Sequence, residues 1–403
     1  MRLKTILVFL FFAVGLLAQN NTNSPYTRYG YGRLDQPVFG RAQAMGGLSY
    51  AMRSNAQINP ANPASYSAVD TMTFMFDIGA SASLSNFSMK KDRHVAGTAN
   101  LDYLAAQFSA TKWLGFSFGL IPFSSVGYDY ETKSSVNGDS ITSTYKGTGG
   151  ITQLYLGVSF LIWKRFALGA NAYYSFGEIN HSRNLTFGNS SYTPTQYSAT
   201  MNVNSFSMRF GFQYTETFLK KHTLTAGFVY DYKANLNGKF ENTLIDTDTI
   251  LTSFNDKKME MPAFYGAGLS YQYDKRLTVG VDYSFREFAK ARYYGKTDSL
   301  KNSHRITLGA EYMNDPFSSK YIDRICWRAG GYLTNSYIGQ KTLDYGVAIG
   351  VGFPLRASRT TLNVTLEYNK IGKNTVASIR EDYFKFSFNA TINETWFFKS
   401  KIK

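Results

Sequence analysis

Apolar and polar residues alternate along most of the chain beyond Asp70. From Leu277 to Phe285 every second residue is apolar, and Thr, Gly, Asp and Ser fill the positions between them. A period of two is typical of a β-strand with two different faces, because successive side chains of a strand point to opposite sides of its sheet. The same alternation recurs over residues 224–231, 345–352 and 362–369. Helical periodicity is nowhere comparably clean, so the pattern predicts an all-β protein.

Counting such segments and the turn residues between them predicts about 14 antiparallel strands. Their expected first residues are Met72, Tyr103, Gly115, Ile151, Phe166, Phe206, Leu224, Phe264, Leu277, Ile306, Trp327, Leu343, Leu362 and Tyr383.

The connections between these strands alternate in length, which distinguishes two readings of the same pattern. In a soluble sandwich the apolar face would pack on a second sheet, whereas in a membrane barrel it faces lipid. Outer-membrane barrels join their strands by short turns on one side and long loops on the other. The expected short turns are 112–114, 164–165, 220–221, 274–276 and 357–360, and the long loops are 86–100, 131–148, 179–203, 236–258 and 289–303. The alternation predicts a transmembrane barrel, with one exception: segment 314–325 is long where a short turn is expected.

The charged residues inside the predicted strands fall on one face. A Lys or Arg on the lipid face at mid-membrane costs about 2–4 kcal/mol, and the apolar face of these strands carries no charged residue. The charges of the opposite parity should line the lumen. We expect plug residues or water to neutralise them, rather than a catalytic role, because no paired partner stands at a catalytic spacing. The charged residues of this parity are Asp77, Arg209, Asp231, Asp282 and Glu311.

The first residues have the order of a secretory signal. Arg2 and Lys4 precede an apolar run from Ile6 to Leu17, and the small residue Ala18 follows it. A permanent helical anchor would need about 20 apolar residues, more than this run supplies. We therefore predict a signal peptide over residues 1–18.

Residues 19–70 show no alternation and read as a compact, non-strand element. Glycines allow tight backbone there, and Arg28, Arg33, Arg41 and Arg53 supply charges that could pair with luminal carboxylates. Two Asn-Pro-Ala units follow, each with a capping Asn and a Pro suited to a turn or to a first helical position. Their residues Asn59, Pro60, Ala61, Asn62 and Pro63 are the candidate plug residues, and residues 71–403 form the predicted barrel.

Composition supports a barrel and limits the chemistry. Aromatic residues make up 16% of the chain and charged residues only 18%, a mixture that suits strands in lipid. The single cysteine, Cys326, excludes an intramolecular disulfide framework and any site built from several thiolates. The net charge of +15 is spread over turns, loops and the N-terminal segment rather than clustered on one face, which argues against nucleic acid. Anionic lipid headgroups explain the sign equally well.

No catalytic or metal-binding pattern stands out. The four histidines, His94, His181, His222 and His304, lie in separate segments without ligand spacing. The Asp246-Thr247-Asp248 triplet lacks the rest of a calcium loop. We therefore expect neither an enzyme, nor a metal site, nor a cofactor.

Two stretches resemble a known family. Gly40-Arg41-Ala42-x-Ala44-Met45-Gly46-Gly47, followed by Asn59-Pro60-Ala61 just before the first strand, resembles the hatch of FadL-type outer-membrane transporters. Gly147-x-Gly149-Gly150 and the strand after it look like the corresponding barrel region, and Ser24 to Gly30 is similar to Bacteroidetes members of the group. The resemblance implies a 14-stranded barrel closed by an N-terminal hatch, which takes up hydrophobic molecules and releases them sideways at an inward kink of the third strand.

The predicted third strand has residues that suit such a kink. Pro122 cannot donate a ladder hydrogen bond, and Gly119 weakens a strand. The alternative is an ordinary strand whose proline sits near the rim. A gap in lipid would have to be lined by polar groups or water.

These observations leave two functional classes open. The first is an outer-membrane channel for passive uptake of a hydrophobic or amphipathic small molecule. The second is a barrel that serves as a scaffold subunit of an outer-membrane secretion or assembly complex, with protein partners. An apolar cavity in the lumen would favour the first, and a lumen filled by polar side chains the second. In both cases an even strand number places both termini on the periplasmic side, with Trp396, Phe397 and Phe398 at the membrane rim.

Overall fold

The computed structural model describes residues 21–136, 139–188, 192–246, 249–254, 259–297, 300–338, 343–355, 360–375 and 378–395. The predicted signal peptide (1–18), the rim residues 396–398 and part of the 246–248 triplet lie outside these ranges. No helix in the described ranges is long and apolar enough to cross a membrane.

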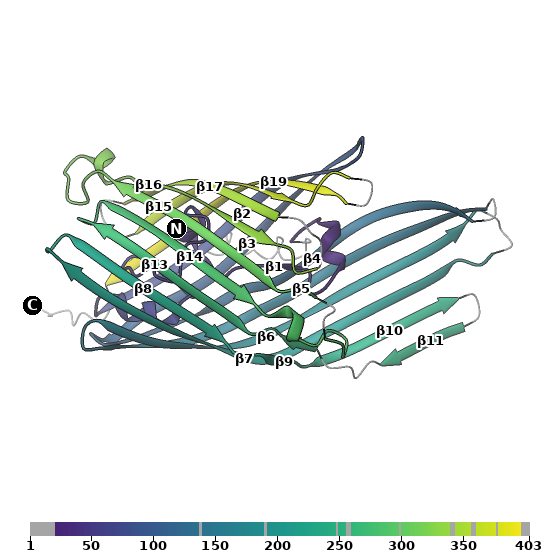
Figure 1. Ribbon diagram of the computed structural model, residues 1–403, viewed down its shortest axis with the longest axis horizontal. Helices are drawn as coiled ribbons and strands as arrows, with labels where there is room; N and C mark the ends of the chain where they lie inside the picture. The colour runs from purple at the N-terminus through teal and green to yellow at the C-terminus, as the bar shows by residue number, and fades with distance from the viewer. Residues whose placement is uncertain are drawn as a thin grey trace, which may run out of the picture.

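Fourteen antiparallel strands form a closed barrel, as the alternation predicted (Figure 1). Each strand pairs with its neighbours, and the last strand pairs with the first, with Thr395 opposite Thr73. The barrel strands are β2 (Thr73–Met89), β3 (Asp92–Thr111), β4 (Leu114–Val136), β5 (Asp139–Ile162), β6 (Phe166–Phe187), β7 (Thr195–Phe218), β8 (His222–Asp231), β13 (Phe264–Tyr273), β14 (Leu277–Arg286), β15 (Ser303–Met313), β16 (Cys326–Asn335), β17 (Leu343–Pro354), β18 (Thr361–Ile371) and β19 (Arg380–Thr395).

The outward face of the strands is apolar and the inward face carries the polar and charged residues, as the alternation predicts. On β14 the outward residues Val279, Val281 and Tyr283 are exposed, whereas Asp282 and Ser284 are buried inside. The outward apolar side chains would contact lipid, and the inward ones form a packed interior. The barrel is therefore apolar outside and mixed inside, the reverse of a soluble protein.

Three strands begin well before the residues predicted for them. β3 begins at Asp92, β5 at Asp139 and β7 at Thr195, so most of the predicted loops 86–100, 131–148 and 179–203 are hairpins instead. These hairpins continue past the ring of strands at one end (Figure 1), where the outward face need not be apolar. The alternation of apolar and polar residues disappears there because both faces of a strand can be polar. The predicted strands were therefore shorter than the observed ones.

The hairpins build a sheet that extends past the barrel at one end, which we call the long-hairpin end (Figure 1). β4 to β7 continue there, and β10 (Gly238–Asp246) pairs with β7 and with β11 (Thr249–Phe254). Beside this sheet, β9 (Ala234–Leu236) pairs with β12 (Met259–Met261), and a 3₁₀ turn, η3 (Phe288–Lys290), follows β14.

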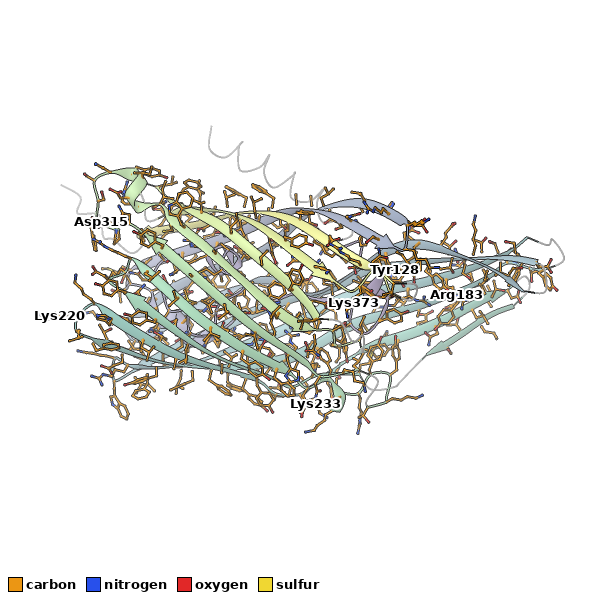
Figure 2. The ribbon with its side chains drawn as sticks, turned by 45° about the horizontal axis from the view of Figure 1, so that its top comes forward. Tyr128, Arg183, Lys220, Lys233, Asp315 and Lys373 are labelled. Carbon is orange, nitrogen blue, oxygen red and sulfur yellow. The ribbon has the colours of Figure 1, made fainter. Side chains whose placement is uncertain are left out.

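The opposite end, which we call the short-turn end, carries tight connections. β3–β4, β5–β6, β7–β8 and β13–β14 are joined by at most three residues, and left-handed residues such as Lys164 and Lys220 make several of these turns. Segment 314–325 is longer, as predicted, and contains the 3₁₀ turn η4 (Tyr321–Arg324). Figure 2 shows Asp315 of this segment at the same end as Lys220.

Residues 21–70, the N-terminal segment, lie inside the ring of strands. They contain η1 (Pro25–Arg28), β1 (Arg33–Leu34), α2 (Gly40–Gln43) and η2 (Pro63–Ala68). η2 contacts β3 to β7, whereas α2 contacts β17 to β19 on the other side of the ring. Contacts on both sides of the ring require the segment to occupy the lumen.

A lipid-face substitution tests the assignment of the faces. Leu308 is 60% exposed in the middle of β15, so Leu308→Lys should lower the free energy of unfolding from lipid vesicles by about 2–4 kcal/mol. Leu308→Met has a similar length without the charge and should cost under about 1.5 kcal/mol. Equal losses in the two variants would contradict a lipid-facing position.

Candidate functional site

The N-terminal segment packs its backbone directly on the barrel wall, at inward-facing glycines. A Cβ added to Gly227 of β8 would lie 2.0 Å from the Tyr50 carbonyl oxygen, and one on Gly169 of β6 would lie 2.4 Å from the carbonyl carbon of Pro63. On another side of the ring, a Cβ on Gly330 would lie 2.2 Å from backbone of the segment. The wall thus has no room for a side chain where the segment touches it.

The two Asn-Pro-Ala units shape this contact. Asn59 Nδ2 donates to the carbonyl oxygens of Ser49 (2.7 Å) and Met52 (3.1 Å). Asn62 Nδ2 donates to Tyr50 O (2.7 Å), and its Oδ1 caps η2 by accepting from the Ala64 N–H. Both units therefore fold the segment on itself by binding backbone.

Wall side chains complete the bonding of these units. Asn171 Nδ2 of β6 donates to Pro60 O at 3.0 Å, and Arg209 Nη1 of β7 lies 3.4 Å from Ala61 O. Pro63 begins η2, where its missing N–H costs nothing. All five candidate plug residues are buried against the segment or the wall.

Asp282 is a wall residue that binds the segment's backbone. Its Oδ2 accepts from the N–H groups of Ser49 (2.6 Å) and Tyr50 (2.9 Å), and the residue is 2% exposed. A carboxylate that accepts two backbone donors makes strong, charge-assisted hydrogen bonds. Asp282 thereby anchors the turn before the first Asn-Pro unit.

Glu311 of β15 joins the segment to the wall through two arginines. Arg41 of α2 forms a two-pronged pair with it, at 2.8 and 2.7 Å, and Arg328 Nε of β16 donates at 2.6 Å. The pairing of Arg41 with a luminal carboxylate is the one expected from sequence. Arg28 and Arg53 have acceptors other than luminal carboxylates. Arg28 donates to Tyr130 Oη, and Arg53 donates to the carbonyl oxygen of Ala64.

The remaining predicted luminal charges are also bonded. Arg209 and Asp231, on adjacent strands, form a two-pronged pair with both distances at 2.7 Å. Asp77 is 1% exposed and accepts from Thr391 Oγ1 (3.0 Å) and from Asn389 Nδ2 of the closing strand. These charges are distributed around the ring and do not converge on one point, which is a structural arrangement rather than a catalytic one.

Cavities beside the segment are small and have mixed polar and apolar linings. One of about 180 Å³ includes Arg33, Arg286 and Arg305 in its lining, and two others measure about 40 and 70 Å³. Sites for drug-sized ligands typically measure about 300–1,000 Å³. Two hollows in that range lie outside the filled lumen: one of about 810 Å³ on the lipid face, around Leu84 and Phe386, and one of about 760 Å³ at the long-hairpin end.

Pairing between β3 and β4 stops halfway along both strands. The last paired residues are Leu104 and Leu120, and the register of β4 against β5 shifts between Pro122 and Ser124. Gly119 sits in the last paired rungs, where a Cβ would lie 2.4 Å from Leu104 O. Beyond this point the β2–β3 and β4–β5 hairpins diverge (Figure 1).

The N-terminal segment takes over the freed edge of β4. β1 pairs with Ser124 and Ser125, the Asp35 N–H donates to Phe123 O at 2.9 Å, and Thr27 Oγ1 accepts from the Gly127 N–H at 3.1 Å. The part of β4 just beyond Pro122 thus pairs with the N-terminal segment in place of β3. Sequence reasoning missed this pairing because two residues are too short to show a period.

Segment 314–325 is ordered by one carboxylate. Asp323 accepts from Asn314 Nδ2 and Ser318 Oγ, both at 2.8 Å. The hydrogen bonds from Asn314 and Ser318 hold the pKa of Asp323 below its ordinary value, so the loop keeps these bonds at neutral pH. It leaves Phe317 82% and Ile322 68% exposed.

The fold and the lumen define the class: a closed β-barrel with the fold of FadL-type barrels and with its N-terminal segment inside. Many solved structures share this fold, and three of them illustrate the similarity. The Pseudomonas aeruginosa FadL homologue superposes with a TM-score of 0.64 at 12% identity, over 91% of this chain and 100% of that one. The Ralstonia pickettii toluene transporter TbuX gives 0.62 at 14%, over 88% and 98%. The P. putida toluene transporter TodX gives 0.59 at 15%, over 91% and 100%.

At these identities the similarity shows the fold alone, and the family comes from sequence. The sequence model of the BamG family matches residues 1–403, and the chain belongs to that family. No curated protein matches the sequence. The resemblance to FadL-type barrels is therefore confirmed for the fold, whereas the similarity of Ser24–Gly30 to Bacteroidetes members stays a prediction.

The glycine contacts predict a strong effect of one methyl group. Gly227→Ala would place its Cβ against the Tyr50 carbonyl, which is backbone and cannot rotate away. We expect residues 40–70 to become sensitive to proteolysis in the purified barrel. Gly97→Ala, whose nearest neighbour would be 3.9 Å away, is the matched control and should leave the cleavage rate unchanged.

The Glu311 network predicts a large loss on neutralisation. Glu311→Gln leaves Arg41 and Arg328 buried without a carboxylate, which should cost about 3–5 kcal/mol of unfolding free energy. The exposed pair Arg165–Glu216, at 2.8 Å, is the control, and Glu216→Gln should cost under about 1 kcal/mol. Similar losses, measured by denaturant unfolding, would show that the network does not hold the segment.

Proposed function

We propose that the protein is a barrel subunit of an outer-membrane protein complex and serves it as a scaffold. The observation that carries this proposal is the filled lumen: the N-terminal segment contacts the wall at glycines, at Asp282 and at Glu311, and the cavities beside it are small. A channel would have to break these contacts for each molecule that passes. A scaffold gains from them, because they make the barrel rigid.

The scaffold proposal divides the chain into three parts. Residues 1–18 direct export, residues 19–70 are a permanent plug, and residues 71–403 are the barrel. Both termini lie in the periplasm, so the short-turn end faces the periplasm and the long-hairpin end faces outward. In this proposal the luminal charges serve to hold the plug, and no catalytic role is assigned to them.

The docking face of the scaffold is segment 314–325. Its hydrogen bonds to Asp323 hold Phe317 and Ile322 outward in a fixed loop. A partner that covers two preordered apolar side chains gains their burial without the entropy cost of ordering the loop. The assignment to the BamG family supports a complex subunit rather than a solitary channel.

Uptake of a hydrophobic molecule is the second candidate, and two observations favour it. The break in β3–β4 pairing at Pro122 lies on the predicted third strand, and relatives of this fold are toluene transporters by name. Lateral release would then require the N-terminal segment to leave the edge of β4 that it pairs with.

Purification from outer membranes in mild detergent, followed by native mass spectrometry, separates the two functions. A scaffold should be recovered with a stoichiometric protein partner. Replacing both Phe317 and Ile322 by Ser should weaken that association by about 2 kcal/mol or more, roughly a thirtyfold effect. Leu219→Asn, which changes an 81% exposed residue at the same end, is the control and should retain the partner.

Recovery of the isolated chain with a bound lipid-like molecule would refute the scaffold proposal. Uptake would gain support if Pro122→Trp, which crowds the seam between β3 and β4, abolished that bound molecule. The two results are mutually exclusive in this preparation.

A further inference from the structure

The hollow at the long-hairpin end has a volume of about 760 Å³ and a lining unlike the rest of the molecule. Strands β4 to β7 and β10 form one wall, and residues 28–30 and the segment after η3 form the other. Figure 2 shows two of its residues, Tyr128 and Arg183, on the part of the molecule that extends away from the short-turn end. We call it the tyrosine hollow.

Tyrosine rings dominate this lining. The lining tyrosines are Tyr29, Tyr128, Tyr145, Tyr197, Tyr293 and Tyr294. Several are held by contacts that fix the ring: Tyr128 Oη bonds His181 Nδ1 at 2.7 Å, and Tyr293 Oη donates to Gly30 O at 2.9 Å. Fixed aromatic faces carry negative potential and attract the positively polarised C–H groups on the face of a ligand ring.

The charge of the hollow has one sign. Arg28, Arg183 and Lys296 line it, and none of its described lining residues is acidic. The guanidinium of Arg28 lies 4.0 Å from the Tyr145 ring centre, and that of Arg183 lies 5.3 Å from it. None of the three cations forms an ion pair with a described residue, so their charge is available to an anion.

A ligand that satisfies both features must present ring faces and negative charge together. Hydrocarbons lack the charge, and a nucleic-acid strand would need a longer basic groove than three cations in one hollow provide. An acidic peptide supplies charge but no ring faces for stacking. Sugars with carboxylate or phosphate groups supply both, and their hydroxyls can bond the phenols and the Asn242 amide.

We propose that the tyrosine hollow binds an acidic saccharide, with Tyr145 stacking on a sugar ring and Arg28 and Arg183 holding its anionic groups. This site is independent of the scaffold function and lies at the opposite end of the barrel. The sugar can be the headgroup of a glycolipid in the same membrane or a glycan from outside it. Both sources offer the same chemistry to the hollow.

Calorimetry on the full-length protein in phospholipid nanodiscs tests the site, with tetragalacturonate as the acidic probe. It should bind at least tenfold tighter than neutral maltotetraose and tighter than an octapeptide of glutamate. Arg183→Gln, at an exposed side chain, should weaken tetragalacturonate about tenfold, as should Tyr145→Leu. Lys146→Gln is the matched control, because Lys146 adjoins Tyr145 on the opposite face of β5, and its affinity should be unchanged.

Equal binding of the acidic and neutral sugars, or no effect of Arg183→Gln, would overturn the proposal. Tighter binding of the glutamate peptide would also overturn it and make the hollow a protein-docking face. Repeating the titration in nanodiscs that contain lipopolysaccharide separates the sources. Loss of tetragalacturonate binding there identifies a glycolipid of the same membrane, and unchanged binding identifies a glycan from outside.

Discussion

The structure depends on one requirement: backbone N–H and C=O groups in a membrane must find partners within the protein. The ring of 14 strands meets it by closing β19 on β2. The requirement is hardest to meet between β3 and β4, where pairing ends at Leu104 and Leu120. There β1 and its neighbours bond the freed edge of β4. The N-terminal segment is thus part of the wall as well as a filling of the lumen.

The same segment explains why the lumen combines glycine with buried charge. Glycine lets two backbones touch, and a touching backbone has polar groups that need partners. Asp282 accepts from two such N–H groups, and Asn171 donates to a carbonyl oxygen on another side of the ring. The carboxylate of Glu311 then requires cations, which Arg41 and Arg328 supply. The close backbone packing in the lumen therefore requires the buried charges that bond it. Together they favour a rigid barrel over an open channel.

The alternation of residues was sufficient to predict the barrel, because lipid on one face forces a period of two. The first residues of β6, β13, β14 and β17 agree with those predicted. Prediction failed for the starts of β3, β5 and β7, where both faces can be polar and the period carries no signal. Contacts made by the N-terminal segment were also beyond reach, since they join residues far apart in sequence. Pairing with luminal carboxylates was predicted for Arg28, Arg33, Arg41 and Arg53 alike, and Arg41 forms such a pair, with Glu311.

Closure of the ring also has a consequence for the N-terminal segment. The strand that completes the barrel is the last one, and its partner β2 directly follows the N-terminal segment. The ends of the ring are therefore about as far apart in sequence as the chain allows. The segment contacts β3 to β7 on one side of the ring and β17 to β19 on the other, so the full set of its contacts exists only once the last strands are in place. Residues near the start of the chain thus gain their complete bonding only from strands near its end.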